Sequence, residues 1–219
     1  MKVTLLRATA DGDELAGSAA AVCTRAQSWK SALEHALKGG HESVIEHVTF
    51  TFQVSQVSRA LLAQLTRHRI ASFSVESQRY CDMGEIPCVI PKSIAERSDI
   101  LYEWEGLITR INSFYRHAVD QGIPKEDARY MTPQAACTNL TMTMNARELK
   151  HFFSLRCCNR AQWEIRDMAD RMYKICKSIC PEIFKDAGPG CVRGDCPEER
   201  PCGKPRKRET LFAGGANEQ

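Results

Sequence analysis

Residues 67–80 concentrate side chains that bind anions. Their sequence is RHRIASFSVESQRY, so three arginines, one histidine and three serines lie within fourteen residues. A guanidinium group offers a planar fork of donors that matches a phosphate, and serine hydroxyls and loop amides add neutral donors. The composition favours binding of an anionic small molecule, with a solvated basic loop as the alternative. No Ser-His-Asp pattern surrounds Ser77, so we expect it to hydrogen-bond a phosphate or base rather than act as a nucleophile.

His41 and His47 flank the sequence ESVIE and raise the question of a zinc site. They are six residues apart, whereas two ligands on one face of a helix need a separation of about four residues. Positions i and i+6 lie on different faces. We therefore expect no metal at these histidines, and the alternative is that they are solvated or capped.

The N-terminal segment lacks the features of a secretion signal. Arg7, Asp11, Asp13 and Glu14 interrupt it, and no apolar run in the chain approaches the roughly 18 residues of a membrane span. A cytoplasmic location is therefore expected. The net charge of +3 is too small to indicate nucleic acid as a partner.

The chain contains eleven cysteines, a high and odd number. In an intracellular protein they are expected to be reduced. Four of them, Cys180, Cys191, Cys196 and Cys202, lie toward the C-terminus and could together hold zinc. None of their spacings is C-x-x-C, so the sequence assigns no metal ligand. Free or occasionally oxidised thiols are the alternative to a structural zinc.

Hydrophobic periodicity predicts a chain of helices with few strands. The expected helices cover residues 17–38, 58–65, 100–119, 126–130 and 146–179, the last with a break near 157–158, and the expected strands cover 48–54 and 138–144. Residues 67–80 are expected to form a polar loop. These elements predict an α+β fold, a single domain at 1–186 with a small mixed or antiparallel sheet flanked by helices. Residues 187–219, rich in Cys, Gly, Pro and basic residues, are expected to be a tail without regular structure.

The sequence RHRIASFSVESQRY resembles the signature loop of the flavin-dependent thymidylate synthases. Further segments agree with that family in the same order. They are GHESVIEH at 40–47, the FTFQV strand, Gln64 three residues before RHR, P-x-E-x-A-R ending at Arg129, NARELKHFFSLR at 145–156 and AQWEI at 161–165. The resemblance covers about residues 17–186, and several segments with compatible spacings make it specific.

The resemblance implies the methylation of dUMP to dTMP. Methylenetetrahydrofolate would give the carbon, and FAD reduced by NADPH would give the hydride. Arg156 is the residue that the family places against the pyrimidine, where a fixed cation stabilises developing negative charge. The resemblance also implies a homotetramer with sites shared between subunits, no catalytic cysteine, and neither nucleic acid nor membrane as a partner.

Further site residues are carried over position by position from the resemblance. For dUMP they are Gln64, Arg67, Val75, Glu76, Ser77, Gln78, Arg79, Arg129 and Arg156. For FAD they are Ser43, Arg67, His68, Arg69, Asn145, Arg147 and His151. The arginines would chiefly hold phosphate, and Val75 and Glu76 would line the pocket through their backbone. Arg147 and His151 are four residues apart on one face of the predicted helix, so both can reach one ligand.

Two other functions remain as alternatives. A non-catalytic nucleotide- or RNA-binding module could use the RHR loop and the basic tail on phosphates, with strongly salt-dependent binding. However, Phe73 and Tyr80 are the only aromatic rings in the loop, and single-strand binders use several. The second alternative is a flavoprotein that methylates another pyrimidine or a uracil in RNA.

Overall fold

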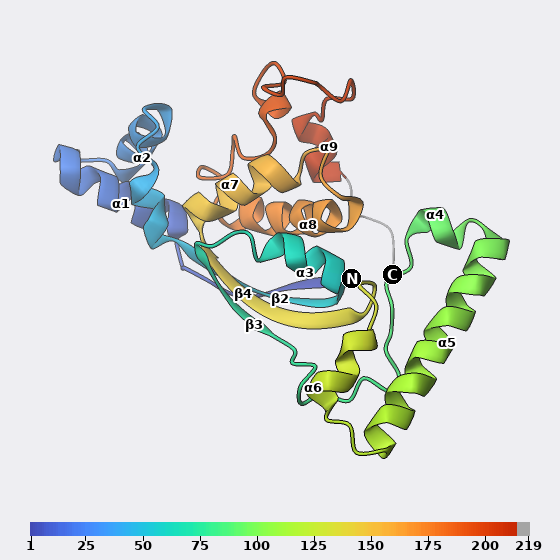
Figure 1. Cartoon of the computed structure of the whole chain (residues 1–219). Helices are drawn as coiled ribbons and strands as arrows, with labels where there is room; N and C mark the ends of the chain where they lie inside the picture. Colours follow the sequence, from blue (N-terminus) through green and yellow to red (C-terminus); the bar gives the residue numbers. More distant parts are fainter. Residues whose placement is uncertain (214–219) are drawn as a thin grey trace. The chain divides into compact units, whose positions relative to one another are not determined.

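The computed structural model describes residues 1–213, so the last six residues of the expected tail lie outside the described part. The chain forms one four-stranded antiparallel sheet, whose strands lie in the order β1-β2-β4-β3 (Figure 1). The strands are β1 (Lys2–Ala8), β2 (Thr49–Ser58), β3 (Ala71–Val75) and β4 (Cys137–Asn145). Helices make up most of the remaining regular structure, which confirms the α+β class.

The helices follow the strands along the chain and are labelled in sequence order. They are α1 (Gly12–Thr24), α2 (Trp29–Lys38), α3 (Arg59–Leu65), α4 (Lys92–Ala95), α5 (Ser98–Asp120), α6 (Lys125–Ala128), α7 (Ala146–Arg156), α8 (Trp163–Ile179) and α9 (Arg208–Ala213). Three short 3₁₀ helices accompany them, η1 (Glu42–His47), η2 (Arg129–Met131) and η3 (Gly190–Val192).

The chain divides into two compact units, and each is described by itself. Unit 1 consists of Met1–Lys2, Val54–Gln64 and Ser74–Leu140. Unit 2 consists of Val3–Gln53, Leu65–Phe73 and the described chain from Thr141 onward.

The core of unit 1 lies around the last turns of α5. Tyr115 and Ala118 on that helix pack with Met83, Ile86 and Ala128. α5 is the long helix of this unit, and it also contacts α4 and α6 (Figure 1). This cluster anchors the segments on either side of α5, which include residues 76–81 and η2.

The core of unit 2 is an aromatic cluster between the sheet and the C-terminal helices. Phe184 packs edge-on against Phe50 of β2 and Phe153 of α7, with ring centroids 5.7 and 5.9 Å apart. Phe153 in turn packs against Tyr173 of α8 at 5.6 Å. α7 lies along α8, and α9 contacts α8 (Figure 1). The buried rings therefore fix α7, the helix that carries Arg156.

A local distortion ends the alternation of β2. Gln56 has a positive φ of 57°, a conformation that non-glycine residues seldom adopt. Its amide N–H donates to the side-chain oxygen of Asn139 at 3.1 Å. After Gln56 two successive residues, Val57 and Ser58, are buried. The Ser58 hydroxyl then accepts from the Leu61 amide at 3.0 Å, so Ser58 caps the next helix.

Several sequence-based expectations need correction. The single helix expected over 17–38 is two helices, because Arg25 takes a left-handed conformation at the end of α1 and α2 begins only at Trp29. β1 was not expected at all. β3 lies inside the stretch expected to be a polar loop, because its alternating sequence ASFSV is only five residues long and lies among charged and polar residues. Residues 208–213 form α9, so the tail is not wholly irregular.

The other expected elements are confirmed. Residues 100–119 lie within α5, 138–144 within β4, and the helical segment from 146 is interrupted between Arg156 and Trp163. Within the described residues, no helix is both long enough and apolar enough to cross a membrane.

Candidate active site

A cavity of 640 Å³ in unit 2 brings the RHR sequence against α7. Its walls combine four arginines with two glutamates, two histidines and smaller groups. The lining residues are Arg67, His68, Arg69, Ile70, Glu148, His151, Ser154, Leu155, Arg156, Cys158, Arg160, Ala161 and Glu198. Five of these, the RHR residues, His151 and Arg156, belong to the set expected from the sequence.

Three side chains in this cavity form a continuous hydrogen-bonded chain. The Nε–H of Arg156 donates to Nε2 of His68 at 3.1 Å. Nδ1 of His68 lies 2.8 Å from the Glu148 carboxylate. His68 and Glu148 are both buried, at 4% and 7% exposure. A carboxylate therefore connects to a guanidinium through an imidazole.

The direction of these bonds defines the protonation state of His68. Because Nε2 accepts from Arg156, the proton of the neutral ring lies on Nδ1, which donates to Glu148. Burial lowers the pKa of His68, and Arg156 lowers it further, whereas the Glu148 hydrogen bond raises it. The ring also packs edge-on against Phe152, with centroids 5.0 Å apart. The imidazole of His68 is therefore neutral and is held in a fixed orientation.

His68, Glu148 and His151 also place three ligand atoms within 4.8 Å of one another, which could suit a metal ion. Both ring nitrogens of His68 already have partners. A cation bound there would have to displace the Arg156 guanidinium and lie beside its charge. The hydrogen-bonded chain therefore accounts for this group better than a metal does.

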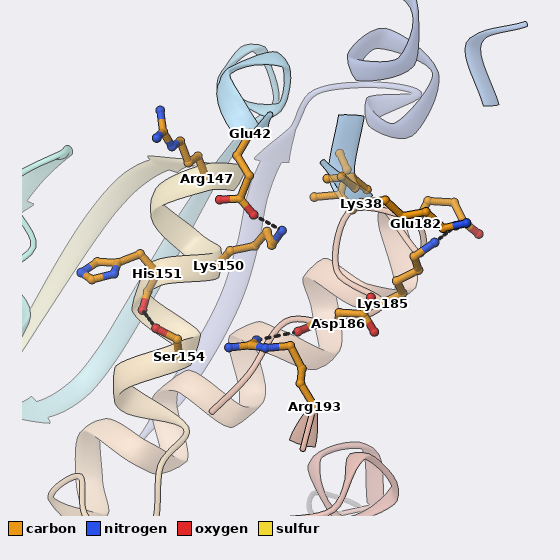
Figure 2. A pocket seen from close by; sticks show the side chains of 12 residues that line it. Lys38, Glu42, Arg147, Lys150, His151, Ser154, Glu182, Lys185, Asp186 and Arg193 are labelled. Carbon is orange, nitrogen blue, oxygen red and sulfur yellow. Dashed lines mark hydrogen bonds and ion pairs between the residues drawn. The ribbon is translucent and has the colours of Figure 1, made fainter. Parts of the chain in front are cut away.

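The other face of α7 borders a second cavity, of 440 Å³ (Figure 2). Arg147, Lys150, His151 and Ser154 project from successive turns of α7, and Lys185, Asp186 and Arg193 approach from the C-terminal segment (Figure 2). Arg147 and His151 do share one helix side, as their spacing predicts. His151 and Ser154 line both cavities.

Ion pairs attach η1 to α7 at this second cavity. Arg147 donates to Glu46 at 2.5 Å, and Lys150 pairs with Glu42. The Glu46 hydrogen bond raises the pKa of Arg147. Ser43, expected to contact FAD, is an exposed residue of η1, between the two acids.

Asn145, also expected to contact FAD, caps α7. Its side-chain oxygen accepts the Glu148 amide at 2.9 Å, as an N-cap residue does. The cap fixes the first turn of the helix and with it the backbone of Glu148, so the asparagine oxygen has a structural role in this conformation. Its side-chain NH₂ group is the donor that it could offer to a cofactor.

Most residues expected to bind dUMP lie together in unit 1. Arg79 and Arg129 both bond to Glu126: Nε of Arg79 donates to its carboxylate at 2.8 Å, and Nε of Arg129 donates to its main-chain carbonyl at 3.1 Å. The Ser77 hydroxyl accepts the Arg79 amide at 3.3 Å. Gln78 is buried and lies 3.5 Å from the Thr132 hydroxyl.

Glu76 and Val75 have mainly structural contacts in unit 1. The Glu76 carboxylate accepts from both the amide and the side-chain NH₂ of Asn139, at 3.2 and 2.6 Å. This carboxylate therefore ties the end of β3 to β4, and Val75 is the last residue of β3. Gln64, on α3, lies 3.4 Å from the Ala60 carbonyl.

Arg59 is a cationic residue that the sequence reasoning missed. One guanidinium nitrogen donates to the Glu76 carbonyl at 2.9 Å, and among the described residues its buried Nε has no partner. Burial lowers the pKa of Arg59, the charge of Glu76 raises it, and the charge of Arg129 lowers it. Two arginines that repel each other favour an anion between them. The only feature of the sequence that could have pointed to Arg59 is its position next to Ser58, which caps α3.

The expected site residues thus fall into two groups. Arg67, His68, Arg69, Asn145, Arg147, His151, Arg156 and Ser43 belong to unit 2, and Gln64, Val75, Glu76, Ser77, Gln78, Arg79 and Arg129 belong to unit 1. Each group has several arginines but few free acids, and unit 2 adds the Glu148–His68–Arg156 chain. The fold and these groups define an α+β protein with two arginine-rich groups, whose chemistry suits anionic ligands, and with one arginine held in a fixed orientation.

Comparison with known proteins identifies the family. Residues 4–182 match the model of the family described as thymidylate synthase complementing protein. Among curated relatives, the flavin-dependent thymidylate synthase of Geobacter sulfurreducens is 43% identical, over 97% of this chain and 98% of that protein. The enzyme of the same name from Nitratidesulfovibrio vulgaris is 46% identical over 80% of this chain and 76% of its own. The flavin-dependent thymidylate synthase of Pyrococcus horikoshii is 46% identical, over 76% of this chain and 72% of that protein. The chain belongs to this family, that of the flavin-dependent thymidylate synthases.

Proposed function

We propose that this chain methylates dUMP to dTMP, with methylenetetrahydrofolate as the carbon donor and with FAD that NADPH reduces. Membership of the family and the names of its relatives support the reaction and the flavin. The structural observation that carries the proposal is the Arg156 guanidinium, held by His68 in a cavity that Arg67 and Arg69 also line.

The residues around this cavity suit an anionic cofactor. Its volume of 640 Å³ lies within the usual range of about 300–1,000 Å³ for ligand pockets. Four arginines line it against two glutamates, and one of these glutamates is engaged by His68. Arg67 and Arg69 are exposed and could donate to a diphosphate. FAD, when bound, supplies the hydride.

Arg156 would activate the uracil ring. Uracil is a poor nucleophile unless its imide nitrogen loses or shares a proton, and the negative charge that develops needs a nearby cation. Burial lowers the pKa of Arg156, and Arg67 lowers it further, but a guanidinium group stays charged in proteins. His68 accepts from Nε of Arg156, and this bond would orient the guanidinium toward the substrate.

The unit 1 residues would hold the rest of dUMP. Arg79 and Arg129 would bind the phosphate, and Ser77 and Gln78 would add neutral donors. The shared partner Glu126 keeps both guanidinium groups near each other before a ligand binds. This arrangement lowers the conformational entropy that phosphate binding would cost.

We further propose a cytoplasmic homotetramer whose sites combine residues from different subunits. The support is the division of the expected site residues between two groups, neither of which contains every expected contact. Light scattering coupled to size-exclusion chromatography would test the assembly. A mass near 98 kDa, four times the 24.6 kDa of the chain, is expected. A monomer at assay concentration would contradict it.

Purified full-length protein provides the direct test of the reaction. It should be yellow, and it should form dTMP from dUMP, methylenetetrahydrofolate and NADPH, with the flavin spectrum changing when dUMP is added. Protein that stays colourless and inactive after FAD is supplied would overturn the proposal. UMP, uridine-containing RNA and oligonucleotides at several salt concentrations should be compared in parallel. Preference for RNA would instead favour one of the two alternative functions.

A variant pair tests the role of Arg156. Arg156→Ala should lower turnover by at least about 100-fold, as loss of a transition-state charge partner does, while FAD is retained. Arg171→Ala on α8 removes an exposed arginine from a surface ion pair and should leave turnover nearly unchanged. Near-normal turnover in Arg156→Ala would remove this residue from catalysis.

A further inference from the structure

A third cavity in unit 2, of 270 Å³, is bordered by four cysteines. Cys158 follows the end of α7, and Cys191, Cys196 and Cys202 belong to the C-terminal tail. The other lining residues are Asn159, Arg160, Gly194, Asp195, Pro201, Gly203, Lys204, Pro205 and Arg206. All eleven cysteines of the chain are free thiols. Four cysteine thiolates are one of the ligand sets that structural zinc sites use.

Backbone geometry brings two of these cysteines to the same cavity. Cys191 lies on the short helix η3, and Pro197 immediately follows Cys196. A Cβ atom on Gly190 would lie 2.5 Å from Cδ of Pro197. Only glycine therefore permits this close approach, and the approach closes the loop that spans Cys191 and Cys196.

Backbone amides donate to two of the sulfur atoms. The Arg206 amide donates to Sγ of Cys191 at 3.3 Å, and the Lys204 amide donates to Sγ of Cys202 at 3.4 Å. Amide N–H groups that point at sulfur stabilise the thiolate form, the form that binds metal. The thiol of Cys202 can also donate to the Lys204 carbonyl, at the same distance.

The charges around the cavity suit a group of thiolates. Arg160, Lys204 and Arg206 line it with one acid, Asp195, and Arg160 and Arg206 also pair with Glu198 and Asp170, which lie outside the lining. Four thiolates and one divalent ion carry a net charge of −2, which nearby cations stabilise.

Cys180 does not belong to this group, although the sequence placed it there. It is fully buried at the end of α8, where its sulfur lies close to Gly12. Burial raises its pKa to about 12, and burial also raises the pKa of Cys176 well above its ordinary value. Both therefore remain protonated thiols of the core. The structure supplies Cys158 as the fourth cysteine.

Metal binding would contract the cavity. In the described part of the chain, no three of these sulfur atoms lie within 4.8 Å of one another. Tetrahedral Zn–S bonds of about 2.3 Å place ligand sulfurs about 3.8 Å apart. Residues 193–207, which carry Cys196 and Cys202, contain neither helix nor strand and can approach Cys158 without disrupting a regular element.

We propose that Cys158, Cys191, Cys196 and Cys202 bind one structural Zn²⁺. The ion fastens the tail to the end of α7, where hydrogen bonds already join the two segments. Nδ2 of Asn159 donates to the Lys204 carbonyl at 2.7 Å, and Arg160 donates to the Arg200 carbonyl at 2.9 Å. The site lies two residues beyond Arg156, so it supports the helix end that carries that arginine without taking part in the reaction.

Metal analysis of the full-length protein tests this proposal independently of any activity. Protein purified without chelators should contain about one zinc per chain, and a mercurial reagent should release it. Cys196→Ser should lose most of the zinc, whereas Cys23→Ser, at an exposed cysteine of α1, should retain it. Because Cys196→Ser could also fail to fold, cobalt substitution of the unmodified protein serves as a second measurement. It should give the visible spectrum of a tetrahedral thiolate site.

Three results would overturn the proposal. Metal-free protein in which Cys158, Cys191, Cys196 and Cys202 react freely would show that there is no such site. Retention of zinc by Cys196→Ser would place the metal elsewhere. Iron with acid-labile sulfide in place of zinc would show that the four thiols hold a cluster instead.

Discussion

The guanidinium Nε of Arg156 donates to Nε2 of His68 across 3.1 Å. This bond, together with the contact of His68 with Glu148, explains why the histidine of the RHR sequence is buried while both neighbouring arginines are exposed. His68 positions Arg156, and Glu148 positions His68. The expected contact of His68 with FAD stays a prediction, and in this conformation both of its ring nitrogens have protein partners.

We predict that Glu148→Gln lowers kcat by roughly 10-fold or more and changes the KM for dUMP far less. The amide can rotate and donate to Nδ1, which moves the ring proton to Nε2 and removes the acceptor of Arg156. In other enzymes, kcat falls strongly when a histidine in the catalytic group is held in the wrong tautomer. Glu148→Asp keeps a charged acceptor and should recover part of kcat. Steady-state kinetics of both variants provide the measurement, and equal losses in both would indicate a merely structural role.

Stability should fall at mildly acidic pH because of His68. Its pKa is lowered in the folded protein, so below the ordinary value of about 6.5 the unfolded state binds a proton that the native ring resists. This contribution is present above pH 6.5 and is lost as the pH falls toward the native pKa. Denaturant unfolding between pH 7.5 and 5.5 measures it.

His68→Gln should flatten this pH dependence, because glutamine can accept from Arg156 and donate to Glu148 without titrating. His35→Gln, at an exposed histidine of α2, is the matched control and should keep the slope. An unchanged slope in His68→Gln would show that other groups cause the acid destabilisation.

Arg59→Ala should weaken dUMP binding by about 10-fold or more, the effect of losing a hydrogen bond to a charged group. The basis is its buried Nε and its closeness to Arg129. Arg97→Ala removes an exposed arginine that pairs with Asp99 and should bind dUMP normally. Flavin-monitored titration with dUMP gives both affinities. Equal affinities for the two variants would exclude Arg59 from the phosphate site.

Arg206→Ala should lower the free energy of unfolding by about 3 kcal/mol, because it leaves a partly buried acid without its cation. Arg206 donates to both Asp170 oxygens at 2.8 Å and to the Cys157 carbonyl at 2.9 Å. The comparable surface pair, Arg208 with Asp186, is about half exposed, so Arg208→Ala should cost less than about 1 kcal/mol. Chemical denaturation measures both, and similar losses would contradict a special role for Arg206.

The long helix α5 and strand β4 could be predicted from the sequence because each has a strong periodicity of its own. Tyr115 and Ala118 recur at helical spacing, and Leu140, Met142 and Met144 alternate. β3 could not be predicted in this way. Its pairing partner, β4, lies more than sixty residues away, and the alternation of Ala71, Phe73 and Val75 with two serines in β3 spans only five residues.

The candidate site likewise has one part that the sequence indicates and another part that only the tertiary structure shows. The resemblance of RHRIASFSVESQRY and of further segments in the same order, among them those that contain Arg129 and Arg156, indicated the family, because such segments are visible in a linear chain. Only the tertiary structure paired His68 with Glu148, 80 residues apart, and with Arg156, 88 residues apart. It also brought Cys158, in place of Cys180, to the cavity of the tail cysteines. Such pairings depend on how helices pack after the core has formed, and no local pattern encodes them.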